Sequence, residues 1–276
     1  MRIATRREFI AVAASGAFLA GTGRPSSSAR PFQEIGRFEA AEARQGVAVD
    51  AAHVFVINDT QVGKYDKTTH RLVARGAGPA PGLLIHLDGG VVVGDKLYCA
   101  HSNYPGLPMT SSVEIWDTST MKHAGSHSFG IHAGSLTWLD RYDGFWWAVF
   151  GNYSRVFGPS QQPYGNTRWT VLEKLDDSWR IISSWIFPEA VLRRVEPMSV
   201  SGGSWGPDGL LYCTGHDAPE LYVLKLPAAG SVLELVETVP SGGHGQGIAW
   251  DRSSPGVLYG IIKSEKVVVV SRRLGA

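Results

Sequence analysis

The sequence has little cysteine and little net charge. Its 276 residues include two cysteines, Cys99 and Cys213, and the formal net charge is +1. Each cysteine follows a Leu-Tyr pair, at equivalent places in two repeats that a further repeat separates. A disulfide requires Cα atoms within about 7 Å of each other. The spacing therefore argues against a disulfide-stabilised scaffold, and we expect two buried free thiols.

The small net charge conceals an uneven distribution. The first thirty residues contain five arginines and one glutamate, which leaves a charge of −3 for the rest of the chain. Nucleic-acid binding calls for a basic patch or stripe, which a weakly acidic chain does not favour. We therefore expect no nucleic-acid partner.

The N-terminus has the features of an export signal. Arg6 and Arg7 stand just before Phe9, and the mildly apolar run 11–20 follows. This arrangement resembles a twin-arginine signal, an address read by the twin-arginine export machinery. The run is too short to span a bilayer. We expect residues 1–30 to be signal and linker, and the protein to be periplasmic or secreted without a membrane anchor.

A short unit, a polar loop that leads into an apolar strand, recurs along the chain. Its clearest copy is residues 241–251, SGGHGQGIAWD. The small residues that open the apolar strand in the five copies are Gly46, Gly90, Ser135, Ser204 and Gly247. The gaps between them are 44, 45, 69 and 43 residues. Repeats of 40 to 50 residues with four short strands each are typical of a β-propeller.

The two ends of the chain indicate how the ring closes. The last copy has room for only three strands, whereas residues 32–38 form a short strand pattern before the first copy. This N-terminal strand would complete the last blade and remove an exposed sheet edge. We therefore expect an all-β fold, a five-bladed β-propeller over residues 31–276 that is closed by the N-terminal strand in the last blade.

Long loops are expected on one face of this ring. The third repeat has about 25 extra residues, divided between 153–167 and 187–198, and a helical turn is expected in the second segment. Loops after second strands and loops between blades open on one face, where they are placed as lids over a working site. On the opposite face, turn residues are expected where first strands end. These are Asp50, Asp140, Asp208 and Asp251.

Five of the nine histidines fall in loops of the long-loop face. His86, His132 and His244 lie just before first strands and are predicted to approach the central axis. Three neutral imidazoles can hold Zn²⁺ or Fe²⁺ with a coordination position left open, so this set predicts a site for a divalent metal (Zn, Fe or Ca). Two alternatives remain: a histidine acts as a general base, or the histidines tie neighbouring blades together by hydrogen bonds.

Further candidates come from the same loops. The residues expected in catalysis are His132, His244, His101 and Arg44, of which the arginine would stabilise developing negative charge. The residues expected to bind substrate are Asn103, Tyr104, Tyr153, Asp217 and Lys263. Tyrosines in long loops are suited to stacking on a sugar ring. His101 and His216 are expected in a ring farther from the axis.

Three stretches carry a family resemblance: 99–105 (CAHSNYP), 111–117 (SSVEIWD) and 202–209 (GGSWGPDG). On these stretches the chain after the signal resembles a family of secreted bacterial and fungal β-propeller proteins. Its expected fold is also similar to that of five-bladed plant-type glutaminyl cyclotransferases and five-bladed furanosidases. The paired acidic residues of the furanosidases have no clear counterpart here, so the resemblance implies the propeller and no particular activity.

These features favour an exported enzyme with a His-rich pocket on the long-loop face. The expected reaction is hydrolysis or β-elimination of a bond in a small or oligomeric polar substrate, with carbohydrate as the favoured class. The alternative is a non-catalytic propeller that binds a glycan or a protein.

Overall fold

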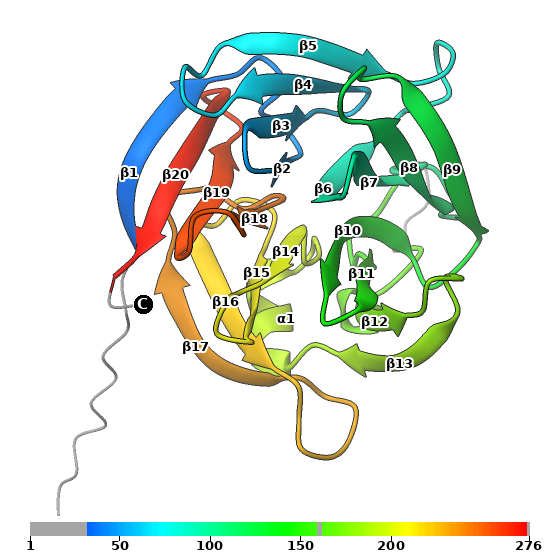
Figure 1. Cartoon of the computed structure of the whole chain (residues 1–276). Coiled ribbons are helices and arrows are strands. Elements are labelled where there is room, and N and C mark those ends of the chain that lie inside the picture. The colour runs from blue at the N-terminus through cyan, green and yellow to red at the C-terminus, as the bar shows by residue number, and fades with distance from the viewer. Residues whose placement is uncertain (1–31, 159–161, 275–276) are drawn as a thin grey trace, which may run out of the picture.

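The computed structural model describes residues 32–158 and 162–274, so the predicted export signal lies outside the described residues. Five four-stranded antiparallel sheets stand around a central axis as the blades of a propeller (Figure 1). This is the predicted all-β, five-bladed architecture.

The strands follow one another outwards from the axis in each blade. Blade 1 consists of β2 (Gly46–Val49), β3 (His53–Ile57), β4 (Gln61–Asp66) and β5 (Leu72–Ala77). Blade 2 consists of β6 (Leu87–Val93), β7 (Lys96–Ser102), β8 (Ser111–Asp117) and β9 (His123–Gly130). Blade 3 consists of β10 (Ser135–Tyr142), β11 (Phe145–Gly151), β12 (Val171–Leu175) and β13 (Ile181–Ile186). Blade 4 consists of β14 (Gly202–Trp205), β15 (Leu211–Thr214), β16 (Glu220–Lys225) and β17 (Glu234–Pro240). Blade 5 consists of β18 (Ala249–Trp250), β19 (Val257–Ile262), β20 (Val267–Arg273) and β1 (Phe32–Glu39).

The N-terminal strand closes the ring, as predicted. β1 pairs antiparallel with β20, with Phe32 opposite Arg273 and Glu39 opposite Val267. The Phe32 ring packs 5.8 Å from the ring of Trp250 in the innermost strand of the same blade. The first and last strands of the described chain therefore pair within one sheet, and this pairing closes the ring.

Burial decreases from the axis outwards. β11 and β19 have almost no exposed residue, whereas the outermost strands β9 and β13 alternate between exposed and half-buried positions. Strands covered on both faces read as continuous apolar runs, and strands covered on one face alternate. The two cysteines, Cys99 and Cys213, are free and buried in second strands, as expected from their equivalent positions.

At the axis, the backbones of neighbouring blades are in direct contact. A Cβ atom added to Gly247 would lie 2.9 Å from the Cα atoms of both Gly46 and Gly89, so the inner strands of blades 5, 1 and 2 approach closely. Only glycine permits such an approach, because it has no Cβ atom. On the other side of the axis the fully buried Trp138 lies against Gly89 and Gly203.

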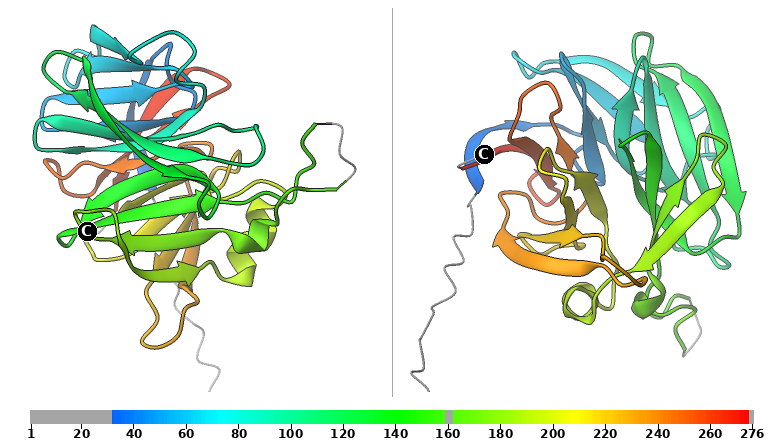
Figure 2. Two further views of the ribbon diagram at one scale, coloured as in Figure 1. Left: turned by 90° about the vertical axis from the view of Figure 1, so that its right-hand side faces the viewer. Right: turned by 60° about the horizontal axis from the view of Figure 1, so that its bottom comes forward.

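The long loops project from one face (Figure 2). Between β11 and β12 the chain forms a loop that ends in the 3-10 helix η1 (Thr167–Trp169), and the expected helical turn between blades 3 and 4 is α1 (Glu189–Val195). No described helix has the length and apolar character needed to cross a membrane.

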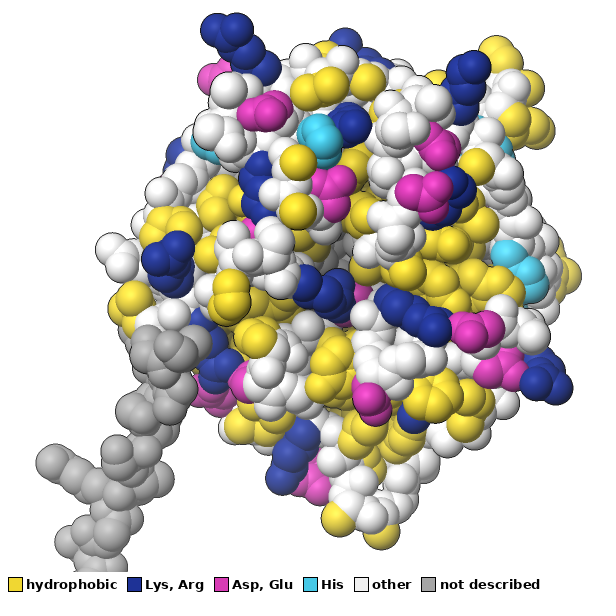
Figure 3. Space-filling view, viewed as in Figure 1, with side chains coloured by type: hydrophobic (Ala, Val, Ile, Leu, Met, Phe, Trp, Pro, Cys, Tyr) yellow, Lys and Arg dark blue, Asp and Glu magenta, His cyan; other side chains and the backbone are white. Residues whose placement is uncertain are grey.

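The opposite face holds the ends of the first strands (Figure 1), and in the space-filling view basic and acidic side chains are interspersed with apolar ones (Figure 3). The aspartates here are more than turn residues. Asp50 does accept from a turn amide, that of Ala52. Asp251, however, pairs at 2.6 Å with Lys67 of blade 1, and Asp140 accepts from the amide of Trp205 in blade 4. These two carboxylates join neighbouring blades.

Candidate functional site

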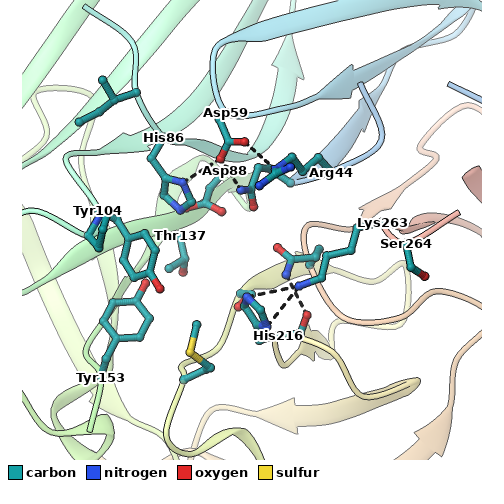
Figure 4. A pocket seen from close by; sticks show the side chains of 16 residues that line it. Arg44, Asp59, His86, Asp88, Tyr104, Thr137, Tyr153, His216, Lys263 and Ser264 are labelled. Carbon is teal, nitrogen blue, oxygen red and sulfur yellow. Dashed lines mark hydrogen bonds and ion pairs between the residues drawn. The ribbon is translucent and has the colours of Figure 1, made fainter. Parts of the chain in front are cut away.

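A cavity of about 730 Å³ lies on the axis of the long-loop face (Figure 4). Every blade contributes to its lining. The lining residues are Arg44, Gln45, Asp59, Ile85, His86, Asp88, Tyr104, Pro105, Thr137, Tyr153, Met198, Ser201, His216, Gln246, Lys263 and Ser264. Of the residues expected at the site, the structure brings together Arg44, His86, Tyr104, Tyr153 and Lys263.

The fold explains why these positions converge. Asp59 lies two residues after the second strand β3 and Lys263 directly follows the second strand β19, whereas Gln45 and Gln246 precede the first strands β2 and β18. In a propeller the ends of second strands and the starts of first strands meet at one face, close to the axis. The cavity is therefore lined by short loop segments held by buried strands, an arrangement that suits a binding site.

Asp59 organises one wall of the cavity. Its Oδ1 accepts a hydrogen bond from Gln45 Nε2 at 2.7 Å and lies 3.1 Å from His86 Nδ1, and its Oδ2 lies 2.6 Å from Arg44 Nε. Burial alone would raise the pKa of Asp59, but these partners lower it below its usual value. Asp59 is therefore an ionised carboxylate that orients an imidazole and a guanidinium.

Asp88 lies beside this group with no hydrogen-bond partner on Oδ2. The register between β6 and β7 slips between Leu87 and Gly90, so Asp88 lies in a β-bulge at the cavity. Asp88 Oδ2 is 3.4 Å from His86 Nε2 and otherwise buried without a partner. Burial raises the pKa of Asp88 to about 8, and the nearby charge of Asp59 acts in the same direction. Asp88 is thus a carboxylic acid that keeps its proton at neutral pH.

His86 sits between the two carboxyl groups. Burial would lower its pKa, but the charge of Asp88 in its ionised form and the charge of Asp59 raise it above the ordinary value for histidine. Because Asp59 accepts from Nδ1, the Nε2 atom is the one that faces Asp88. At 3.4 Å the two groups do not form a hydrogen bond, but each lies close enough for its charge to act on the other.

Two tyrosines form an aromatic wall. The Tyr104 ring stacks on the His86 imidazole with centroids 4.7 Å apart and contacts the Tyr153 ring at 5.1 Å. The hydroxyl groups of both tyrosines point towards one another at the cavity (Figure 4). Burial raises the pKa of both phenols, most strongly that of Tyr153, so both are hydrogen-bond donors at neutral pH.

A third group faces these residues from blades 4 and 5 (Figure 4). Lys263 Nζ lies 3.3 Å from His216 Nδ1 and 2.7 Å from Asp217 Oδ1 at the rim. Asp217 also lies 2.5 Å from His216 through its other oxygen, and Lys263 and His216 lower its pKa against the effect of burial. Asp217, expected to bind substrate, holds the two lining residues in place from the rim.

His132, expected at the axis, lies elsewhere. Its Nε2 is 3.0 Å from Oε2 of the buried Glu173 in the third strand of blade 3, and its ring packs against Phe150. A buried carboxylate and an aromatic neighbour draw the imidazole outwards, between strands. The placement of His132 at the axis was wrong.

His244 also points away from the cavity. Its backbone amide donates to Ile261 O, and the next two residues, Gly245 and Gln246, both have positive φ angles. This left-handed pair turns the chain so that Gln246 lines the cavity while His244 is exposed. The prediction of His244 as a pocket residue was therefore wrong.

His101 and Asn103 are held within blade 2. His101 Nε2 accepts from the amide of Ile85, and its Nδ1 lies 2.9 Å from Ser112 Oγ. Asn103 closes its own loop, donating to Pro108 O and accepting from the amide of Thr110. Neither residue lines the cavity, so direct roles in catalysis or substrate binding are not supported for them.

The expected three-histidine metal set is not assembled. His86 is engaged with Asp59 and Asp88, whereas His132 and His244 lie outside the cavity. Within residues 32–158 and 162–274, no group of three or more His, Cys, Asp or Glu side chains is arranged to hold a metal ion. The described residues therefore do not form the predicted site for Zn, Fe or Ca.

Sequence reasoning missed Asp88, the most unusual group of the cavity. It occurs directly after His86-Leu87, at the start of an apolar strand pattern. An acidic residue at such a place was the feature that could have indicated a functional group. The bulge in which Asp88 lies cannot be recognised in the sequence pattern. Thr137, Met198, Ser201 and Ser264 were missed as well.

No protein-family model and no curated protein matches the chain. Among solved structures it is similar to Myxococcus xanthus glutaminyl cyclase, with a TM-score of 0.58 and 12% identity over 88% of this chain and 96% of that one. It is also similar to the β-propeller domain of Myceliophteria thermophila Cps50 (Swd1), with a TM-score of 0.50 and 12% identity over 88% and 99% of the two chains. At such identities the likeness shows the fold alone. The chain is thus a five-bladed β-propeller with distant structural similarity to a glutaminyl cyclase.

Proposed function

We propose that this protein is an exported enzyme in which Asp88 acts as a general acid on a polar substrate bound in the axial cavity. The observation that carries the proposal is the Asp88 carboxyl group, buried and without a hydrogen-bond partner on Oδ2. Buried carboxyl groups with raised pKa values recur at catalytic sites, where they remain protonated and donate a proton.

The reaction proposed is hydrolysis or β-elimination at a carbon–oxygen bond. Both reactions expel an oxygen leaving group, and protonation of that oxygen by a carboxylic acid lowers the barrier of either. Asp88 supplies this proton. The attacking water in hydrolysis, or the substrate carbon in elimination, releases a proton. The Nε2 atom of the adjacent His86, which is held by Asp59, accepts this proton and returns it to Asp88 after turnover.

A carbohydrate is the substrate class that this cavity favours. Sugars present apolar ring faces and a rim of hydroxyl groups, which calls for an aromatic surface beside hydrogen-bonding groups. Tyr104 offers the aromatic surface, and Lys263, His216 and Ser264 offer polar groups on the facing wall (Figure 4).

The test is a screen of the purified protein against neutral and acidic oligosaccharides with two readouts. New reducing ends report cleavage by either reaction, and ultraviolet absorbance of an unsaturated product reports elimination. For any substrate that is turned over, Asp88→Asn should lower kcat by about 10²- to 10⁴-fold, the usual contribution of a general acid. Asp95→Asn, which changes an exposed aspartate paired with Lys96, is the matched control and should leave kcat unchanged.

Binding without turnover would favour the alternative. If an oligosaccharide binds the wild type and Asp88→Asn equally and neither converts it, the protein is a glycan-binding propeller and Asp88 is not an acid catalyst. A Tyr104→Ala variant locates the bound sugar, because loss of the aromatic wall should weaken binding by roughly tenfold.

A further inference from the structure

His86 and Asp88 are carried by a short backbone segment that three hydrogen bonds fix to its surroundings. The amide of Leu87 donates to Asp59 O at 2.9 Å, and the amide of Ser102 donates to His86 O at 3.0 Å. The third bond runs from the amide of Ile85 to Nε2 of His101 at 3.2 Å. Only this third bond depends on a side chain.

The accepting role of His101 is enforced by a chain of partners across blade 2. A ring nitrogen that accepts carries no proton, so the proton of neutral His101 is on Nδ1, which faces Ser112 Oγ at 2.9 Å. Ser112 Oγ in turn donates to Glu114 Oε1 at 2.7 Å. Because the Ser112 hydroxyl donates its proton to Glu114, its oxygen is free to accept a hydrogen bond from His101.

Glu114 anchors the far end of this chain. Its carboxylate is buried and also accepts from Ser126 Oγ at 3.0 Å, while its other oxygen lies 2.8 Å from His123 Nε2. The network therefore crosses blade 2 from β9 through β8 to β7 and ends on the loop that enters β6. Burial lowers the pKa of His101 despite the nearby charge of Glu114, which agrees with a neutral ring.

We infer that His101 is a positioning residue: through its Nε2 atom it fixes the backbone of Ile85 and so orients His86 towards Asp59 and Asp88. A protonated ring or the other tautomer would point an N–H group at the Ile85 amide and lose the bond. This inference deepens the proposed function and rests on it for the rate measurement alone.

Two substitutions of one residue separate this role from simple packing. In His101→Gln the terminal amide can reach the place of Nε2 and accept from Ile85, whereas in His101→Asn the shorter side chain reaches only the place of Nδ1. We expect amide hydrogen exchange at Ile85, measured by NMR, to stay slow in the Gln variant. In the Asn variant it should quicken roughly tenfold or more, the cost of one hydrogen bond.

Two further readouts test the effect on the site. The Nδ1–H tautomer of His101 should be visible in the imidazole ¹⁵N shifts of the wild type, and the imidazole shifts of His86 should move in the Asn variant only. With a substrate found as above, the Asn variant should lower kcat and displace the pH–rate profile, and the Gln variant should restore both.

Equal protection of the Ile85 amide in all three proteins, or the opposite tautomer, would overturn the inference. If His101→Asn does not fold, Ser112→Ala supplies the same test, because it removes the acceptor that holds the tautomer. An absence of turnover in every protein would count against the proposed function, while exchange at Ile85 would still decide the role of His101.

Discussion

The imidazole of His86 and the carboxyl group of Asp88 face each other across 3.4 Å in the wall of the axial cavity. The two residues are separated by one position in the chain, and Asp88 lies within a bulge of the β6–β7 pairing. Asp59 engages the other ring nitrogen of His86 and so orients the pair from one side.

The rate of the proposed reaction should fall at alkaline pH. Burial raises the pKa of Asp88 to about 8, and a general acid must carry its proton, so kcat should decline as the pH rises through about 8. A pH–rate profile on any substrate found in the screen measures this. A profile that is flat between pH 7 and about 9 would exclude Asp88 as the acid.

Asp88→Asn should remove a pH-dependent loss of stability. From about pH 4, where aspartate titrates in an unfolded chain, up to about pH 8, folded Asp88 binds a proton that the unfolded chain has released, so folding weakens as the pH rises. Asparagine does not titrate. Relative to the wild type, the variant should gain about 4 kcal/mol in free energy of unfolding between about pH 4.5 and pH 7.5. Urea unfolding at both pH values measures the gain, and parallel curves would contradict it.

Lys67→Met should destabilise the contact between blades 5 and 1. The substitution leaves the buried carboxylate of Asp251 without its cation at 2.6 Å, which costs about 3 kcal/mol in similar cases. Although burial raises it, the pKa of Asp251 is lowered overall by Lys67 and Ser253, so the cost is present at neutral pH and shrinks as acid protonates Asp251. Thermal and urea unfolding measure it.

The matched control for that substitution is Lys225→Met. Lys225 pairs with Glu234 at 2.9 Å, but both side chains are about half exposed. Exposed pairs contribute less than about 1 kcal/mol, so this variant should unfold like the wild type. Equal losses in the two lysine variants would show that burial of Asp251 is not what makes its pair important.

Gly247→Ala should be costly although it adds a single methyl group. The new Cβ atom would lie 2.9 Å from backbone atoms of blades 1 and 2, and backbone cannot rotate away as a side chain can. Overpacking of this kind costs about 1–3 kcal/mol. Gly125→Ala is the control, because nothing lies within 4 Å of its added Cβ atom. The difference in the urea midpoint between the two variants checks the prediction.

The fold could be predicted because its determinants repeat. Gly46, Gly90 and Ser135 recur at gaps of 44 and 45 residues, and residues 32–38 supply the strand that the last copy lacks. Each blade has the same pattern, an apolar strand between a turn and a loop. A strand that is hard to assign in one repeat can therefore be assigned by comparison with the other repeats.

The site could be predicted only in part, because it has no repeat. Arg44, His86 and Lys263 were found because the face of a loop follows from its place in the blade. The direction in which a side chain points within that loop does not follow from its place in the blade. His244 faces out because Gly245 and Gln246 adopt left-handed conformations, and Asp88 lies in a bulge that the sequence pattern does not reveal.

The contact of Gly46, Gly89 and Gly247 constrains how this protein can evolve. These three residues lie directly beside Gln45, Asp88 and Gln246 in the chain, so the backbone that carries these cavity residues is packed against the backbone of neighbouring blades. A larger residue at any of the three glycines would disturb that packing. New specificities in descendants of this chain should therefore arise by replacing side chains of the lining, such as Tyr104 or Lys263, while the contact of the three glycines stays the same.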